Sequence, residues 1–313
     1  MEPWKQAEMV YEETMAPRYD FHYYRSPVSR AHLREFFKLV RRHALRHQWI
    51  LDVGGGTGAV TERLLNHGYT HVVTVDLSPA MLREARKKMP ALRAIVCDGE
   101  HLPFKDDAFR TIICSSVLHH LPFPDRMLKE IKRAVAPYGV LIAQEPNQNH
   151  FLTRPESYPV NSISTMLMHY LYRIECYEPV GEPPIHEYHR AFTRQEIVRL
   201  FTDQFSILYF RSEFAFSCLF SKLRSPIMAR IILAMDRCLR RKDGSVFHIV
   251  CSKTDVGHRN LLKNYFRFLE TLREDPDQRM PGLILFSFLP LIVLGRAYEL
   301  YERIRSKLGK SIY

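Results

Sequence analysis

Short apolar runs alternate with amphipathic stretches along the first half of the chain. The pattern predicts strands over residues 49–53, 71–75, 94–97, 110–114 and 140–144, and helices over 28–48, 59–67, 79–89 and 124–135. A Pro-Tyr-Gly turn at 137–139 is expected to close the last of these helices. Strands separated by helical patterns of about 10–15 residues need right-handed crossovers, so the sequence predicts a parallel, doubly wound sheet.

The regular alternation of predicted strands and helices ends after Glu145. A stretch rich in Pro, Asn and Tyr runs to about Tyr188 and contains one apolar helix near 163–174. A helix over 193–201 follows, and Thr193 and Glu196 have the spacing of a capping box. Two more strands, 205–210 and 246–252, flank a helical insertion at about 212–243, and two tail helices are predicted over 260–270 and 283–307. The last two strands are expected to form an antiparallel pair at one sheet edge.

Composition narrows the class of protein. With 313 residues, 46% hydrophobic and 25% charged, the chain has the composition of a globular protein, which excludes wholesale disorder. The six cysteines form no CxxC pair and no zinc-finger spacing with histidine, so we expect neither a disulfide framework nor a metal site, and a cytoplasmic location. No apolar secretory segment is visible in residues 1–19, and the uncharged run 281–295 is shorter than the ~20 residues that cross a bilayer.

The positive charge is concentrated in the last third of the chain. The formal net charge is +11, and residues 222–313 alone hold 18 Lys and Arg against 9 Asp and Glu. This excess accompanies the most apolar stretch of the sequence, a combination that suits an anionic membrane surface better than a nucleic-acid groove. Ordinary solvated charge on helices is an equally open interpretation. The sequence therefore allows a peripheral membrane location.

The strongest local signal is a glycine turn between the first strand and the next helix, Asp52-Val53-Gly54-Gly55-Gly56-Thr57-Gly58. Glycines permit a tight turn and a close approach of a ligand to backbone N–H groups. Gly54, Gly56 and Ala59 also satisfy the dinucleotide fingerprint, which is weak alone. Asp52 stands where a diphosphate would be repelled and a cationic ligand welcome, which disfavours an NAD-dependent oxidoreductase.

Two further acids follow predicted strands. Asp76 ends the second strand, where a carboxylate can accept hydrogen bonds from both ribose hydroxyls. Ser78 is the expected N-cap of the following helix, so capping does not explain Asp76. Asp98 ends the third strand, where it can accept from an exocyclic amino group while adjacent backbone N–H groups meet ring nitrogens. These positions predict a nucleoside site at one edge of the sheet.

Five ordered motifs now resemble one family. They are the glycine turn after Asp52, Asp76 with Ser78-Pro79-Ala80-Met81, the run 98–104, the run Ser115-Ser116-Val117-Leu118-His119-His120-Leu121, and Glu130-Ile131-Lys132-Arg133 before Pro137. Together they are similar to class I S-adenosylmethionine-dependent methyltransferases, in the type 11 and ubiquinone/menaquinone C-methyltransferase-like branch. The resemblance covers residues 9–145. Tyr138-Gly139 departs from the more usual Gly-Gly, which the turn is expected to tolerate.

The resemblance implies S-adenosylmethionine as cofactor, S-adenosylhomocysteine as product, and no metal. The glycine turn and Asp52 would hold the methionine moiety, Asp76 the ribose, and Asp98 the adenine edge, with Tyr19 covering the cofactor and Ser115 bordering its methionine end. The implied cofactor-binding residues are Tyr19, Asp52, Gly54, Gly56, Gly58, Asp76, Leu77, Met81, Asp98, Gly99, Glu100 and Ser115.

Catalysis by methyl transfer rests on positioning, and a base is needed only if the nucleophile carries a proton. The candidate catalytic residues are His119, Glu145, His186 and His189. The acceptor implied is a small or lipid-like molecule. An RNA methyltransferase is a second hypothesis, weakened by the absence of an aromatic-interleaved basic module, and a non-catalytic cofactor-binding subunit is a third. The acceptor atom and the oligomeric state stay open.

These observations give the organisation expected of the whole chain. Residues 1–48 are predicted to form entrance helices, 49–254 a class I methyltransferase domain, and 255–313 a basic, partly apolar helical extension. The expected fold is α/β: a doubly wound, Rossmann-like, seven-stranded and mostly parallel sheet with an antiparallel edge, a helical insertion and a helical C-terminal extension.

Overall fold

A computed structural model of the chain describes residues 2–148, 191–214, 217, 225–239 and 244–253. The chain divides into two compact units, Met1–Thr254 and Asp255–Tyr313, and the described residues all belong to the first. His186, His189, the predicted helix over 163–174 and the basic extension 255–313 lie outside the described residues. Within the described residues, no helix is long and apolar enough to cross a membrane.

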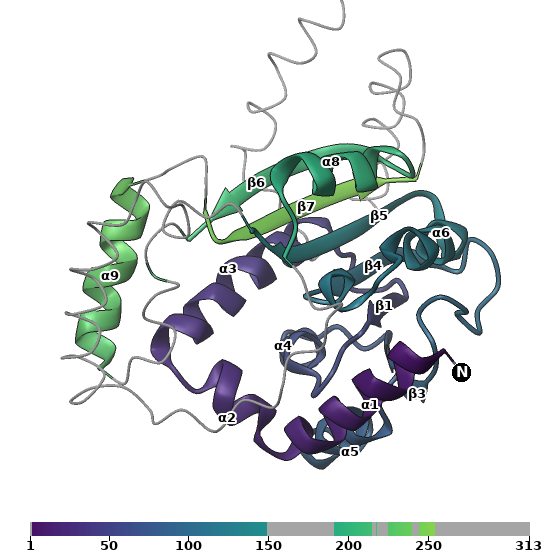
Figure 1. Ribbon diagram of the computed structural model, residues 1–313, viewed down its shortest axis with the longest axis horizontal. Coiled ribbons are helices and arrows are strands. Elements are labelled where there is room, and N and C mark those ends of the chain that lie inside the picture. Colours follow the sequence, from purple (N-terminus) through teal and green to yellow (C-terminus); the bar gives the residue numbers. More distant parts are fainter. Residues whose placement is uncertain (1, 149–190, 215–216, 218–224, 240–243, 254–313) are drawn as a thin grey trace, which may run out of the picture. The chain divides into compact units, whose positions relative to one another are not determined.

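A seven-stranded sheet organises the first unit, in the order β3-β2-β1-β4-β5-β7-β6 (Figure 1). Its strands are β1 Ile50–Val53, β2 Val72–Asp76, β3 Ala94–Val96, β4 Phe109–Ser115, β5 Val135–Pro146, β6 Ser206–Glu213 and β7 Val246–Ser252. The first five are parallel, and β7 pairs antiparallel with both β5 and β6. The predicted doubly wound sheet with an antiparallel edge is confirmed.

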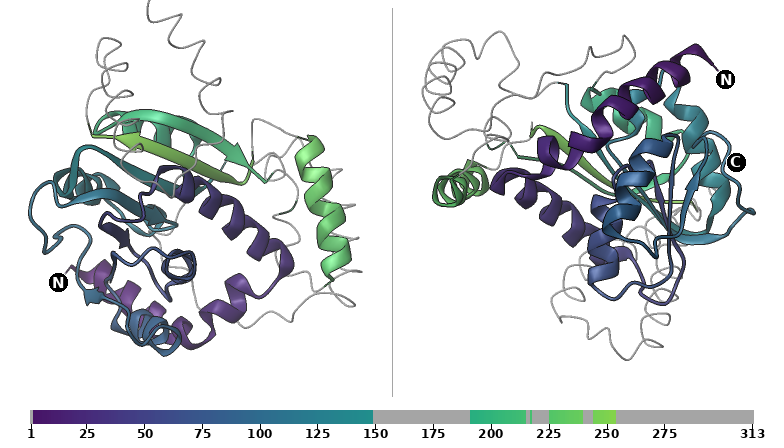
Figure 2. Two further views of the ribbon diagram at one scale, coloured as in Figure 1. Left: turned by 180° about the vertical axis from the view of Figure 1, so that it is seen from behind. Right: turned by 90° about the horizontal axis from the view of Figure 1, so that it is seen from below.

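Helices lie on both faces of the sheet, as the edge-on view shows (Figure 2). They are α1 Pro3–Met15, α2 Tyr19–Tyr24, α3 Pro27–His43, α4 Ala59–Asn66, α5 Pro79–Lys88, α6 Pro124–Ala134, α8 Arg194–Thr202 and α9 Pro226–Leu239, with the short 3-10 helices η1 Ala16–Arg18 and η2 Leu118–His120. Side-chain oxygens of Ser26, Ser78 and Thr193 accept from the first turns of α3, α5 and α8. These polar caps explain why the helices begin where they do.

The core has two halves because both faces of the parallel sheet are covered. One cluster joins Leu51 and Val53 of β1 to the apolar faces of α6 and α8. The other joins Ile50 to α3 and α4. Neighbouring residues of β1 thus point to opposite halves, and all four are buried. Such strands appear in the sequence as continuous apolar runs, which is why the pattern identified them.

The sequence pattern predicts a turn at residues 137–139 between a helix and a strand that begins at residue 140, and this boundary is wrong. Residues Pro137, Tyr138 and Gly139 lie within β5, where the pairing shifts between Phe109↔Val135 and Thr111↔Val140. Tyr138 takes a left-handed conformation with φ 60°, at the position where the resembling family more usually has glycine. A non-glycine residue there costs about 1–2 kcal/mol. The prediction misplaced the turn because a bulge and a turn share the same residue types.

Candidate functional site

The glycine turn follows β1 at the edge where the parallel strands end. Gly54 and Gly56 have φ of 65° and 55°, which glycine alone adopts readily. A Cβ at Gly54 would lie 2.3 Å from the Val117 side chain, whereas a Cβ at Gly56 would meet nothing within 4 Å. The turn is therefore packed on one side and open at Gly56, which leaves room for a ligand against the backbone.

Asp52 lies beneath this turn. Its side chain is buried, and its Oδ2 accepts the Thr61 hydroxyl at 2.6 Å. Burial raises the pKa of Asp52 to about 7; the Thr61 hydrogen bond opposes the rise, and the charge of Asp76 adds to it. The turn thus sits over a carboxylate whose ionised form lacks a cationic partner among the described residues, an environment that favours a cationic ligand.

Asp76 ends β2 and contacts the glycine turn directly. Its Oδ2 accepts the Gly56 N–H and its Oδ1 accepts the Ser78 N–H, both at 2.8 Å. Burial raises the pKa of Asp76, although both backbone hydrogen bonds oppose the rise. Because each carboxylate oxygen has two acceptor positions, one remains on each oxygen for a ligand hydroxyl.

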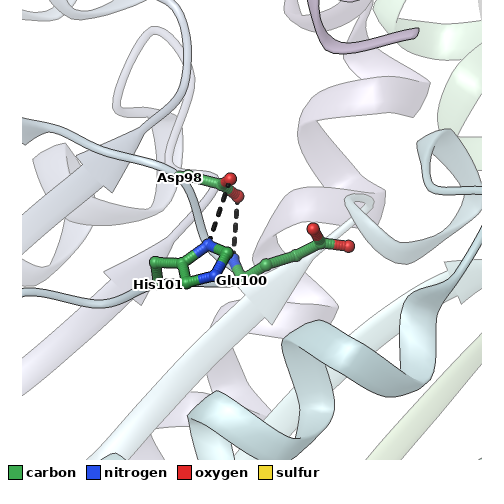
Figure 3. Close-up of side chains that lie close together, drawn as sticks. All are labelled: Asp98, Glu100 and His101. Atoms are coloured by element: carbon green, nitrogen blue, oxygen red, sulfur yellow. Dashed lines mark hydrogen bonds and ion pairs between the residues drawn. The ribbon is translucent and has the colours of Figure 1, made fainter. Parts of the chain in front are cut away.

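Asp98 follows β3, the strand next to β2, and a cation from α1 meets it there. Lys5 Nζ donates to Asp98 Oδ2 at 2.7 Å and to Glu100 Oε2 at 2.5 Å. Burial lowers the pKa of Lys5, but the hydrogen bonds to both acids outweigh it, so the pKa is raised overall. Figure 3 shows Asp98 beside Glu100 and His101. The Asp98 carboxylate accepts hydrogen bonds from the Glu100 backbone N–H and from the His101 ring.

Asp98, Glu100 and His101 are the group of described residues whose ligand atoms gather closely enough to hold a metal ion. The ammonium of Lys5 already fills that role as the cation between the two acids. A cavity of about 890 Å³ opens beside them, and Leu77 and Lys5 are among its lining residues. Leu77 and Asp98, both predicted adenine contacts, therefore border one space.

Tyr19 and Met81 are also brought together. Met81 is buried at the start of α5 in a small cluster with Met15 and Ala16, and Tyr19 packs against it. Gly99 lies against Met127 of α6, where a Cβ would be 2.3 Å from Met127 Cε. The predicted cofactor residues thus follow one line along the carboxyl ends of β1 to β3, and their contact with a cofactor stays a prediction.

Two of the predicted catalytic residues, His119 in η2 and Glu145 in β5, form one buried group. Ser115, a predicted cofactor-binding residue, is the last residue of β4. Glu145 Oε1 accepts the backbone N–H groups of Val117 and Leu118 at 3.0 and 2.8 Å, and Oε2 lies 2.8 Å from His119 Nδ1. Burial and the neighbouring His120 lower the pKa of His119, and Glu145 opposes this. Glu145 thus holds the loop after β4 and orients the His119 ring.

Sequence reasoning missed two charged residues of α1 that face this edge. Lys5 binds Asp98 and Glu100, Glu8 Oε1 lies 3.0 Å from His120 Nδ1, and both Lys5 and Glu8 lie on α1. Hydropathy patterning assigns charged residues to solvent, so it could not place them inside. Their spacing of three, beside the buried Trp4, was a signal in the sequence for a buried polar helix face.

The residues of this edge fit S-adenosylmethionine. The turn is open at Gly56, Asp76 has acceptor positions to spare, and the ionised form of Asp52 lacks a cationic partner among the described residues. Buried acidic groups without enough cationic partners suit a ligand that carries positive charge and hydroxyl donors.

Comparison with known proteins agrees with this geometry. A family model described as "Methyltransferase domain" matches residues 51–143. The chain is 37% identical over 114 residues to malonyl-[acyl-carrier protein] O-methyltransferase of Halorhodospira halophila, covering 35% of this chain and 38% of that protein. It is 35% identical over 108 residues to the ubiquinone/menaquinone biosynthesis C-methyltransferase UbiE of a Ruegeria species, covering 32% and 43%. The chain thus matches less than half the length of either relative.

A solved structure shares the fold. It is a possible histamine N-methyltransferase, described as S-adenosylmethionine-dependent, from Thermotoga maritima, with a TM-score of 0.52 and 18% identity over 79% of this chain and 99% of that one. Residues 51–143 thus match a methyltransferase domain, in keeping with the resemblance to the type 11 branch of class I S-adenosylmethionine-dependent methyltransferases, and the chain shares the fold of this solved structure.

Proposed function

We propose that this protein transfers a methyl group from S-adenosylmethionine to a small-molecule or lipid-like acceptor. The observation that carries the proposal is the line of acids, Asp52, Asp76 and Asp98, at the ends of β1, β2 and β3 around an open glycine turn. Each acid stands where one part of the cofactor needs a hydrogen-bond acceptor or a negative charge. The matched methyltransferase domain supports the same conclusion.

The cofactor supplies an activated methyl group on a sulfonium. The chain's own residues bind and orient it: Asp76 accepts from ribose hydroxyls, Asp98 accepts from the adenine amino group, and the turn's backbone N–H groups meet the methionine carboxylate. Asp52 contributes negative charge from beneath the turn. Because methyl transfer is an in-line displacement, this orientation supplies most of the acceleration.

The group around Glu145 would serve the acceptor side. With Nδ1 donating to Glu145, the His119 ring has its basic nitrogen at Nε2, so His119 is our proposed proton acceptor for a nucleophile that carries a proton. Glu145 is a positioning residue, because its two oxygens bind backbone N–H groups and the histidine. His186 and His189 stay as sequence-based alternatives to His119.

The acceptor class is supported by the relatives' names. One methylates a malonyl group on an acyl carrier protein, and the other a carbon in quinone biosynthesis. Both names indicate acceptors other than nucleic acid. The basic excess of residues 222–313 supports a peripheral position on an anionic membrane, where a lipid-like acceptor is at hand.

Calorimetric titration of the full chain with S-adenosylmethionine, S-adenosylhomocysteine and NAD tests the cofactor. We expect micromolar binding of the first two and none of NAD. Absence of binding by both sulfur ligands to folded protein would overturn the proposal. If both bind and no quinone, phenol or lipid extract accepts a labelled methyl group, the non-catalytic hypothesis takes its place.

Vesicle sedimentation of the full chain tests the membrane position. We expect binding to vesicles of phosphatidylcholine with phosphatidylglycerol, and weak binding to phosphatidylcholine alone, because the attraction is electrostatic. Added salt should release the protein, since it screens charges over about 10 Å at 0.1 M. Equal sedimentation with neutral and anionic vesicles would contradict the proposal.

A further inference from the structure

One face of α1 carries three charged residues toward the cofactor edge. Lys5, Glu8 and Glu12 are spaced by three and four residues, so they share a face of the helix. Lys5 meets Asp98 after β3 and Glu8 meets His120 after β4. Glu12 faces the end of β2, where Asp76 raises its pKa by charge and Ser78 lowers it. α1 thus lies along the predicted nucleoside site, beside α5 (Figure 1).

Glu12 differs from the other two in its partners. Its Oε2 is buried and has no hydrogen-bond partner among the described residues. Burial and the charges of Asp76 and Glu8 raise the pKa of Glu12 well above its usual value. A buried carboxylate oxygen without a donor costs free energy comparable to a lost hydrogen bond, so the site is incomplete without a donor.

A hydroxyl is the donor that fits this position. The described groups close enough to ligate a metal are Asp98, Glu100 and His101, and Glu12 is not among them. Asp76, beside Glu12, keeps one acceptor position on each oxygen after binding the Gly56 and Ser78 N–H groups. Two carboxylates with acceptor positions side by side suit the two adjacent hydroxyls of a ribose.

We propose that Glu12 is a cofactor-binding residue whose carboxylate accepts a hydrogen bond from one ribose hydroxyl while Asp76 accepts from the other. The inference rests on the proposed function, because the ribose belongs to S-adenosylmethionine and its product. It adds a residue of α1, outside the matched methyltransferase segment 51–143, to the nucleoside site. The ribose would then be held by residues from two elements, Asp76 of β2 and Glu12 of α1.

Replacement of Glu12 tests the contact, and its neighbour Glu13 provides the control. Glu13 is exposed and pairs with Arg83 of α5 at 2.6 Å. Glu12→Leu should weaken S-adenosylhomocysteine binding about tenfold or more by calorimetry, and Glu12→Gln should weaken it less, because an amide oxygen still accepts. Glu13→Gln should bind like wild type. The ligand-free melting temperature of Glu12→Leu should be unchanged or raised, since the variant removes a buried carboxylate oxygen that has no donor among the described residues.

Deoxy analogues identify the hydroxyl. With one of the two analogues, 2′-deoxy- or 3′-deoxy-S-adenosylhomocysteine, Glu12→Leu should bind as well as wild type, because that analogue lacks the hydroxyl that Glu12 binds. With the other analogue, the loss caused by Glu12→Leu should remain. Equal S-adenosylhomocysteine affinity of wild type and Glu12→Leu would overturn the inference, as would the same loss with both analogues. If wild type itself binds no S-adenosylhomocysteine, the proposed function fails first, which distinguishes the two failures.

Discussion

At the scale of single residues, the acids of the cofactor edge differ in what they already bind. Asp76 is the acid that joins two elements, since its oxygens hold Gly56 of the turn and Ser78 of α5. We expect Asp76→Ala to weaken S-adenosylhomocysteine binding by tenfold or more, on the order of 1.4 kcal/mol or above, by calorimetry. Asp125→Ala, which removes an exposed acid paired with Lys129, is the control. Unchanged affinity in Asp76→Ala would contradict the ribose assignment.

Asp52 makes a prediction about stability and pH. Its pKa is raised to about 7 by burial, from an ordinary value of 3.8. Between these values the folded state holds a proton that the unfolded state has lost, so this group destabilises the fold increasingly as pH rises to about 7. In Asp52→Asn the penalty is absent, and the Thr61 hydroxyl keeps an acceptor.

The stability of Asp52→Asn relative to wild type should therefore rise from pH 4 to pH 7 and then level off, by roughly 4 kcal/mol at most. Urea unfolding of both proteins across this range measures the difference. Burial lowers the pKa values of His32 and His43 to about 3 and 4, so these two residues make the folded state less stable as pH falls below about 6.5. This effect is the same in both proteins and cancels in the difference. A difference independent of pH would contradict the raised pKa.

At the scale of elements, α1 is held to the sheet by one buried cation. Lys5 is 5% exposed and bridges Asp98 and Glu100. Lys5→Met leaves those two acids without their cation, and removing one member of a buried ion pair costs several kcal/mol. We expect hydrogen exchange of the α1 amides to quicken tenfold or more, while exchange of β1 and β4 stays as in wild type.

A lysine on α5 provides the comparison for that experiment. Lys87 pairs with Glu84 on the exposed side of its helix, where an ion pair contributes about 0–1 kcal/mol. Lys87→Met should therefore leave exchange unchanged throughout. Wild-type exchange of α1 in Lys5→Met would mean that the apolar contacts of Trp4 and Met15 hold the helix without the ion pair.

Elements were predictable from the sequence where burial is two-sided and uninterrupted. The runs at β1 and β2 are buried at every position, and the turn residues around them are glycine and proline. β5 was underpredicted because Pro137 and Gly139 belong to a bulge inside the strand. Residues 1–48 were expected to form helices, but the bounds and the buried face of α1 were not predicted, because that face combines Trp4 and Met15 with Lys5 and Glu8 and has no clear hydropathy period.

At the scale of the whole molecule, a bound ligand should stabilise the first unit. S-adenosylhomocysteine at 100 times its Kd should add about 2.7 kcal/mol to the free energy of unfolding. For a unit of this size, that is a rise of roughly 5–10 °C in melting temperature. Differential scanning fluorimetry with NAD as control measures it. An equal rise with NAD, or no rise with S-adenosylhomocysteine, would contradict the cofactor.

The candidate site as a whole was predictable only in part. Asp52, Asp76 and Asp98 were identifiable as candidates because each lies at or just after the carboxyl end of a strand, and the strand ends of a parallel sheet share one edge. The pairing of His119 with Glu145 depends on the register of β4 against β5, which spacing along the chain does not determine. Lys5, Glu8 and Glu12 could not be assigned to the site from the sequence, because their positions depend on how α1 lies against the carboxyl ends of the strands.

The two halves of the core bear on how this protein could be recombined with its relatives. The matched segment 51–143 begins inside β1 and ends inside β5. It omits α3, whose Phe36 and Phe37 cover the face of the sheet that includes Ile50, and it omits β7, which pairs along β5. The segment that sequence comparison recognises is thus smaller than the unit that shares one core and one sheet. A chimaera cut at the ends of the recognisable segment would expose both halves of the core, whereas crossover points before α1 and after β7 would transfer the nucleoside site together with the acids that face it.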